Sequence, residues 1–175
     1  QLHPESPTYN IPAVFNIYGP LNIPALQKSI DTVIRRHDVF TLTFSQQGRI
    51  QKHSIGDELH ARLEQTPLGS VGTPDQLKQL LTQEITRPFN LNTGPLFRAR
   101  LIHLDTEKYV LLLVMHHCIT DLRSKELLGA QISTCYDTIV KKRNLPVLES
   151  AYQYSHFIRR RQAWLLTQPA REMLN

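Results

Sequence analysis

The stretch Val114-Met115-His116-His117-Cys118-Ile119-Thr120-Asp121 decides how this sequence is interpreted. It closes an apolar run at residues 109–115, whose short length and Val and Leu content predict a buried β-strand. Residues 124–142 follow with apolar side chains at helical spacing, so two histidines and an aspartate fall where a strand ends and a helix begins. A rigid strand that opens into a loop is a common position for functional side chains.

The spacing His-His-x-x-x-Asp lets only one of the two histidines face a given cavity. Because adjacent strand residues point to opposite faces, one of His116 and His117 should support the other. A histidine titrates near neutrality, so the exposed one could take up a proton and return it. On spacing alone, a pair of structural histidines with Asp121 as a helix N-cap is the simpler interpretation. Two neighbouring histidines and one acid form no recognised zinc motif, so we expect no metal site.

Residues 115–121 are similar to the HHxxxDG active-site motif of the condensation domains of nonribosomal peptide synthetases. Three further segments resemble that family in the same order along the chain. Residues 36–44 resemble its RHExLRTxF segment, residues 87–101 its PFDLxxGPLxRxxL segment, and residues 152–165 its YxDYAxWQxxWL region. Together the four matches cover nearly the whole chain, which is therefore identified as a member of this family.

The resemblance implies an α/β fold with helices packed on a mixed β-sheet, as in one lobe of the two-lobed chloramphenicol-acetyltransferase-like fold. With 175 residues, 41% of them apolar, the chain can form one domain with a sizeable core. Family members are much longer, and the match covers only their first lobe. We therefore expect residues 1–175 to form the N-terminal lobe, without the C-terminal lobe and the extreme N-terminus, and to be inactive in isolation.

In this family an acyl donor arrives as a thioester on the phosphopantetheine arm of a carrier protein, and an amine on a second carrier attacks it. The resemblance implies that His117 is the general base, or that it positions the amine and stabilises charge in the tetrahedral state. His116 is implied to be structural, and Asp121 to hold the loop through an arginine. No cofactor is expected to bind directly, because the arm belongs to the carriers. Adjacent synthetase modules and the C-terminal lobe are the other implied partners.

Two positions depart from the family pattern. Leu122 stands where the family has a glycine after the aspartate, and Thr41 stands where it has an arginine. Because a glycine lets a ligand arm pass close to the backbone, Leu122 is a candidate tunnel-lining residue that narrows this path. The departures leave three functions open: amide-forming condensation, ester formation on the same fold, and a non-catalytic condensation-like module that docks a carrier or a tailoring enzyme.

The formal net charge is +5, and positive side chains concentrate at residues 141–143 and 159–161. These are either solvated helix faces or a docking surface for an acidic partner such as a carrier protein. Nucleic-acid binding and a membrane span are not expected, because the chain has neither a known module nor about 18 consecutive apolar residues. Cys118 and Cys135 form no disulfide framework and fit a reducing cytoplasm, and Cys118 is expected to be a packing thiol.

The remaining sequence predicts an alternation of strands and helices. A helix should begin at Asn22 with Pro24 in its first turn, and another after the capping box at Thr73. Strands are expected at residues 13–18, 40–45, 49–55, 61–65, 96–103 and 109–115, and a last helix at 150–166. Trp164 in that helix is expected to be a packing anchor.

Overall fold

The computed structural model describes residues 6–45, 49–52, 62–143 and 153–166. The strands are β1 (Asn10–Tyr18), β2 (Leu42–Phe44), β3 (Ile50–Lys52), β4 (Leu63–Thr66), β5 (Phe97–Asp105) and β6 (Lys108–His116). The α-helices are α1 (Ile23–Arg36), α2 (Pro74–Thr86), α3 (Leu122–Val140) and α4 (Tyr154–Leu165), and short 3₁₀ helices η1 (Pro7–Tyr9) and η2 (Asp38–Thr41) connect them to strands.

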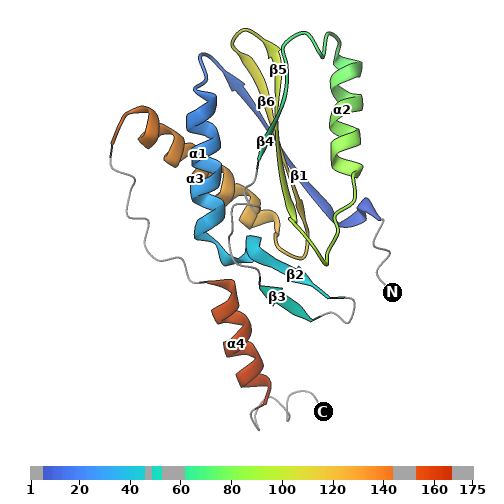
Figure 1. Ribbon diagram of the computed structural model, residues 1–175, viewed down its shortest axis with the longest axis vertical. Helices are drawn as coiled ribbons and strands as arrows, with labels where there is room; N and C mark the ends of the chain where they lie inside the picture. The colour runs from blue at the N-terminus through green and yellow to red at the C-terminus, as the bar shows by residue number, and fades with distance from the viewer. Residues whose placement is uncertain (1–5, 46–48, 53–61, 144–152, 167–175) are drawn as a thin grey trace.

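The strands form a four-stranded mixed sheet in the order β1-β6-β5-β4 and a separate β2–β3 hairpin. Strand β6 pairs antiparallel with β1 and β5, while β4 runs parallel to β5. Helices α1 and α3 lie on one side of the sheet and α2 on the other (Figure 1). The predicted α/β fold with helices packed on a mixed sheet is confirmed.

Strand β6 is the centre of the core and ends at the His-His motif. Its residues from Tyr109 to Met115 are all buried, because the strand has neighbours on both edges and helices on both faces. On one face Leu101 and Leu113 belong to the same cluster as Ile30 of α1 and Ile132 of α3. On the other face, leucines of α2 pack against Ile102 of β5 and Val110 of β6, the leucines being Leu77, Leu80 and Leu81.

The predicted helix starts are confirmed because the signals for them are local. The Asn22 side chain accepts a hydrogen bond from the amide of Ala25, which makes it the N-cap of α1. Thr73 and Gln76 form the expected capping box at the start of α2. Strand β1 instead begins three residues before the predicted start, at Asn10. The reason is tertiary, since the Asn10 side-chain amide donates to the carbonyl oxygens of Ile85 and Arg87 at the end of α2.

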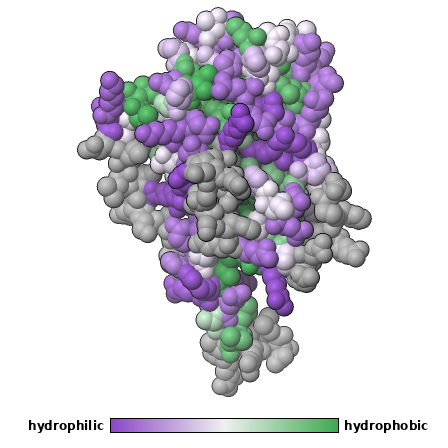
Figure 2. Space-filling view, viewed as in Figure 1, coloured by the Kyte–Doolittle hydropathy of each residue, from purple (hydrophilic) through white to green (hydrophobic). Residues whose placement is uncertain are grey.

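Trp164, expected to be a packing anchor, does not belong to the core of the described residues. Its side chain is 45% exposed, and α4 buries none of its side chains among the described residues. Helix α4 lies beyond the β2–β3 hairpin, away from the four-stranded sheet (Figure 1). Figure 2 shows apolar side chains on its visible face between hydrophilic ones, and Phe157 and Leu165 are among the exposed apolar residues. Residues 53–55, residue 61 and residues 150–152 of the predicted elements lie outside the described residues.

The described part of the chain lacks two features, a membrane-spanning helix and a cluster of metal-binding side chains. No helix there is long and apolar enough to cross a membrane. The same residues contain no group of three or more His, Cys, Asp or Glu side chains that could hold a metal ion.

Candidate active site

Backbone hydrogen bonds hold the loop that carries the His-His motif. The His116 amide donates to the carbonyl oxygen of Leu96 at 3.0 Å, and the His117 amide donates to that of Tyr9 at 2.8 Å. The Ile119 amide then donates to the His116 carbonyl oxygen at 3.0 Å and closes a turn. The loop between β6 and α3 therefore leaves the sheet in a fixed direction.

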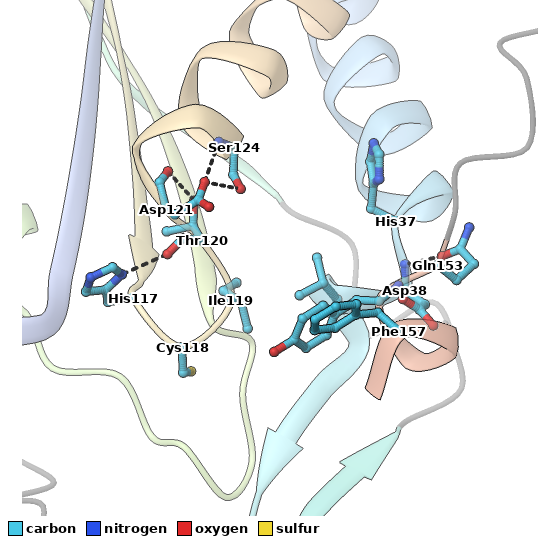
Figure 3. A pocket seen from close by; sticks show the side chains of 12 residues that line it. His37, Asp38, His117, Cys118, Ile119, Thr120, Asp121, Ser124, Gln153 and Phe157 are labelled. Carbon is cyan, nitrogen blue, oxygen red and sulfur yellow. Dashed lines mark hydrogen bonds between the residues drawn. The ribbon is translucent and has the colours of Figure 1, made fainter. Parts of the chain in front are cut away.

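The His117 imidazole is exposed, and one hydrogen bond sets its tautomer. Its Nδ1 lies 2.8 Å from the carbonyl oxygen of Thr120 (Figure 3). Because a carbonyl oxygen can only accept, Nδ1 must carry a proton. In the neutral ring the Nε2 atom then keeps its lone pair and can accept a proton.

His116 has the opposite arrangement. Its Nδ1 accepts from the Cys118 amide at 3.2 Å and lies 2.9 Å from the Cys118 sulfur. The ring lies between those of Tyr9 and Phe89, with centroid distances of 5.9 and 6.2 Å. Burial, followed by the neighbouring charge of His117, lowers the pKa of His116 below its ordinary 6.5. His116 is therefore a neutral, packed side chain.

Cys118 is not a nucleophile in this arrangement. Burial raises the pKa of its thiol to about 11, so the sulfur stays protonated near neutrality. The thiol can donate to His116 Nδ1, which agrees with the expected packing role.

Asp121 is the N-cap of α3. Its Oδ1 accepts from the Ser124 amide at 2.7 Å and from the Ser124 hydroxyl at 2.6 Å. These bonds, the hydroxyl's first, hold the pKa of Asp121 below its ordinary 3.8. The carboxylate is exposed, and no arginine in the described ranges forms an ion pair with it. Within this chain Asp121 therefore braces the loop through the cap that spacing alone favoured, and not through a buried arginine pair.

A pocket of about 470 Å³ opens beside the motif loop. The motif loop supplies residues 117–121 and α3 supplies Ser124 (Figure 3). The segment after α1 supplies residues 37–39, and the start of α4 supplies Gln153, Tyr154 and Phe157. His117 lines this pocket and His116 does not, and because β6 ends at His116 the turn at His117 separates the two side chains, not the alternation of strand residues. The sequence did not show that residues 37–39 and 153–157 meet here, although both belong to family-like segments.

The two positions that depart from the family pattern differ in their surroundings. Leu122 is the first residue of α3, is 69% exposed, and therefore does not belong to the core. Thr41 is buried, and its hydroxyl donates to the Asp38 carbonyl oxygen at 2.7 Å. Thr41 thus stabilises η2 at the edge of the pocket, where the family has a long cation.

The family model of the condensation domain matches residues 1–172. The chain belongs to the condensation domain family. The identification made from the four sequence segments is thereby confirmed.

Curated relatives of this condensation-domain chain are much longer synthetase polypeptides. The chain is 35% identical over 170 residues to a linear gramicidin synthase polypeptide of Brevibacillus parabrevis, and the alignment covers 94% of the chain and 2% of that relative. It is 32% identical over 154 residues to a plipastatin synthase polypeptide of Bacillus subtilis, and this alignment covers 87% of the chain and 6% of that relative.

Solved structures show the same fold. The starter condensation domain of rhizomide synthetase matches 95% of the chain and 40% of its own length, with a TM-score of 0.80 and 19% identity. VibH, a condensation enzyme, matches 95% of the chain and 38% of its own length, with a TM-score of 0.76 and 17% identity. The X-domain from teicoplanin biosynthesis matches with a TM-score of 0.79 and 22% identity, over 93% of the chain and 35% of that domain. The chain therefore spans less than half of each of these structures.

Proposed function

We propose that this chain is the N-terminal lobe of a condensation domain that forms an amide bond between a carrier-bound acyl thioester and an acceptor amine. The observation that carries the proposal is the hydrogen bond from His117 Nδ1 to the Thr120 carbonyl oxygen. It fixes the ring and leaves Nε2 as the acceptor atom at an exposed edge of the pocket. A positioned imidazole of this kind is suited to proton transfer at a nucleophilic nitrogen.

The proposed reaction moves one proton from the amine to the leaving thiolate, and it needs no covalent acyl-enzyme. The amine nitrogen attacks the thioester carbonyl carbon, a C–N bond forms, and the C–S bond breaks. The amine loses one proton and the departing thiolate gains one. His117 Nε2 takes the first proton, or holds the amine by a hydrogen bond while charge develops, and returns it to the leaving group.

The other motif residues support His117 in this proposal. Asp121 fixes the start of α3, and its cap on Ser124 holds the end of the loop that contains Thr120. His116 remains neutral and packs under the loop. Cys118 stays a thiol and takes no part in acyl transfer.

Phosphopantetheine enters the proposal as the arm that brings the substrate. It would supply the thioester, and the partner carrier proteins would hold it. The pocket has both polar and apolar side chains, a lining that suits an arm containing amides and methylenes. Leu122 is exposed beside Asp121 and is not among the residues that line this pocket, so we propose that it narrows the path of the arm outside the pocket. No step requires a cofactor bound by this chain.

Carrier proteins, adjacent synthetase modules and the C-terminal lobe are the proposed partners. The basic segment at residues 141–143 is exposed, and Lys141 already pairs with Asp137 at 2.8 Å on the same helix. An exposed ion pair of this type contributes little to stability, so Lys141 can readily leave Asp137 and pair with another carboxylate. The segment therefore remains available to an acidic carrier surface.

The test is reconstitution of a synthetase that carries this chain within its condensation domain. Donor and acceptor carriers are loaded, mixed with the synthetase, and followed by intact-protein mass spectrometry. The proposal predicts transfer of the donor acyl group to an amine-bearing acceptor carrier. Transfer only to a hydroxyl-bearing acceptor supports ester formation, and binding of carriers without any transfer supports a docking module. Either result contradicts amide formation.

A further inference from the structure

The first turn of α4 is joined to the segment after α1, more than a hundred residues earlier in the chain. The Tyr154 amide donates to Asp38 Oδ1 at 3.0 Å. The Gln153 side chain makes two further bonds to the same segment: its Oε1 accepts from the Asp38 amide at 2.9 Å, and its Nε2 donates to the Arg36 carbonyl oxygen at 3.0 Å. We call these three hydrogen bonds the Asp38–Gln153 clasp.

Helix α4 needs such an attachment. It has 12 residues, and none of their side chains is buried among the described residues. Isolated helices shorter than about 12–15 residues are marginal in water, so a helix of this kind depends on its ends and its contacts. Gln153 occupies the N-cap position but makes no side-chain cap hydrogen bond to α4. Its amide group is used by the clasp instead.

Asp38 supplies the missing cap from another element. Its carboxylate accepts the first-turn amide of Tyr154, where an anion also opposes the positive end of the helix dipole. Asp38 is only 8% exposed, so its hydrogen bonds are formed away from bulk water. The clasp thus both begins α4 and fixes its direction relative to η2.

The same segment is tied to α3. His37 Nε2 lies 2.8 Å from Gln131 Oε1, and because an amide oxygen only accepts, the imidazole donates. Residues 36–38 therefore connect α3, which begins at the motif loop, with α4, which supplies the aromatic part of the pocket lining. Tyr154 and Phe157 of α4 are stacked, with ring centroids 6.1 Å apart, and both line the His117 pocket.

We propose that Asp38 and Gln153 are positioning residues that hold α4 in place as a wall of the pocket that His117 also lines. This proposal rests on the proposed function for the claim that the pocket receives substrate. The clasp itself is a separate claim about the chain, and it can be measured without any substrate.

The clasp is tested first by hydrogen exchange on Asp38→Ala, Gln153→Ala and the double variant. Loss of an N-cap should make the α4 amides exchange about tenfold faster, while the β6 amides exchange as in the wild type. In the double variant the α4 amides should exchange about as fast as in either single variant, because each single replacement already breaks the clasp. Asp38→Glu keeps a carboxylate and should largely restore slow exchange. Asp137→Ala and Gln79→Ala, on exposed faces of α3 and α2, are the matched controls.

Fluorescence gives an independent reading of α4. Trp164 is the sole tryptophan of the 175-residue chain and lies in α4, so the emission reports on this helix alone. The clasp predicts lower anisotropy of Trp164 in Gln153→Ala than in the Gln79→Ala control. Because Gln153 is only half-buried, Gln153→Ala should still fold. It therefore tests the clasp even if Asp38→Ala does not fold. Unchanged α4 exchange and unchanged anisotropy in Gln153→Ala overturn the clasp.

The positioning role is tested by kinetics in the reconstituted synthetase. Gln153→Ala should raise KM for the carrier-bound substrates about tenfold with kcat nearly unchanged, whereas loss of His117 should lower kcat. Faster α4 exchange with an unchanged KM overturns the positioning role and leaves the proposed function intact. Absence of condensation by the wild-type synthetase overturns the proposed function, and the exchange measurements still decide the clasp.

Discussion

His117 donates its Nδ1 proton to the carbonyl oxygen of Thr120, three residues further along the same loop, at 2.8 Å. His116, one residue earlier, accepts at its own Nδ1 from the Cys118 amide. Two adjacent imidazoles are therefore held in opposite tautomers by short local bonds. This difference separates a ring that can accept a proton at the pocket from one that packs beneath the loop.

Replacement of Asp121 tests its role as a cap. Asp121→Ala should speed hydrogen exchange at Ser124 and the other first-turn amides of α3 severalfold, because it removes their acceptor. Asp121→Asn keeps an acceptor oxygen and should restore most of the protection. Condensation by the synthetase should fall with the loss of protection. An Asp121→Ala variant with normal exchange but no activity would show instead that the carboxylate acts directly.

Leu122→Gly tests whether the exposed leucine narrows the path of the substrate arm. In the reconstituted synthetase it should raise turnover or broaden the acyl groups accepted. Because Leu122 is outside the core, the cost to stability should be only the backbone freedom of glycine, about 0.5–1 kcal/mol. Arg123→Gly, one residue later in the same turn, is the control for this backbone effect. Equal loss of stability in both variants with unchanged turnover contradicts the tunnel-lining role.

The lowered pKa of His116 predicts a pH dependence of stability. A histidine whose pKa falls on folding binds its proton more readily in the unfolded chain. Its contribution to stability is therefore complete above its ordinary pKa of 6.5 and is lost as the pH falls from there through the lowered value. Urea unfolding at pH 7.5 and at progressively lower pH should show this decline in the wild type. The decline in stability should be smaller in His116→Asn. An equal decline in both proteins would contradict the assignment of this pH dependence to His116.

Gly129→Ala tests the packing of α3 on the edge strand. Alanine is the better helix former, by about 1 kcal/mol, but its Cβ would lie 2.9 Å from the Phe15 ring. We expect overpacking to dominate, with a net loss of about 1–2 kcal/mol in urea denaturation. Phe15→Leu should relieve the contact, so the double variant should be more stable than Phe15→Leu alone. A Gly129→Ala variant more stable than the wild type contradicts this packing.

The features that the sequence predicted well are those that depend on near neighbours. Strand β6 was predicted because a continuous apolar run needs burial on both faces, and α1 and α2 because Asn22 and Thr73 cap the residues just after them. The motif residues likewise lie within one short loop. For Asp121 the spacing predicted the helix N-cap that the structure shows, whereas the resemblance implied an arginine partner that the described residues do not supply.

Contacts between distant segments could not be predicted from the same patterns. The Asp38–Gln153 clasp joins residues 115 positions apart, and nothing in either local sequence specifies the other. The Asn10 side chain donates hydrogen bonds to carbonyl oxygens at the end of α2, and β1 therefore begins earlier than its local sequence predicts. Trp164 was expected to be a packing anchor and is 45% exposed, because hydrophobicity alone does not say what a helix packs against.

The most direct test of the account compares two replacements of His117 in the reconstituted synthetase. Alanine removes both ring nitrogens, whereas asparagine places an amide near Nδ1 that can still donate to the Thr120 carbonyl oxygen. Both variants lack Nε2, so both should condense about two to four powers of ten more slowly than the wild type. His117→Asn should keep the wild-type stability and loop protection. A His117→Asn variant that condenses at a near-normal rate would contradict the central claim that Nε2 of His117 acts on the amine.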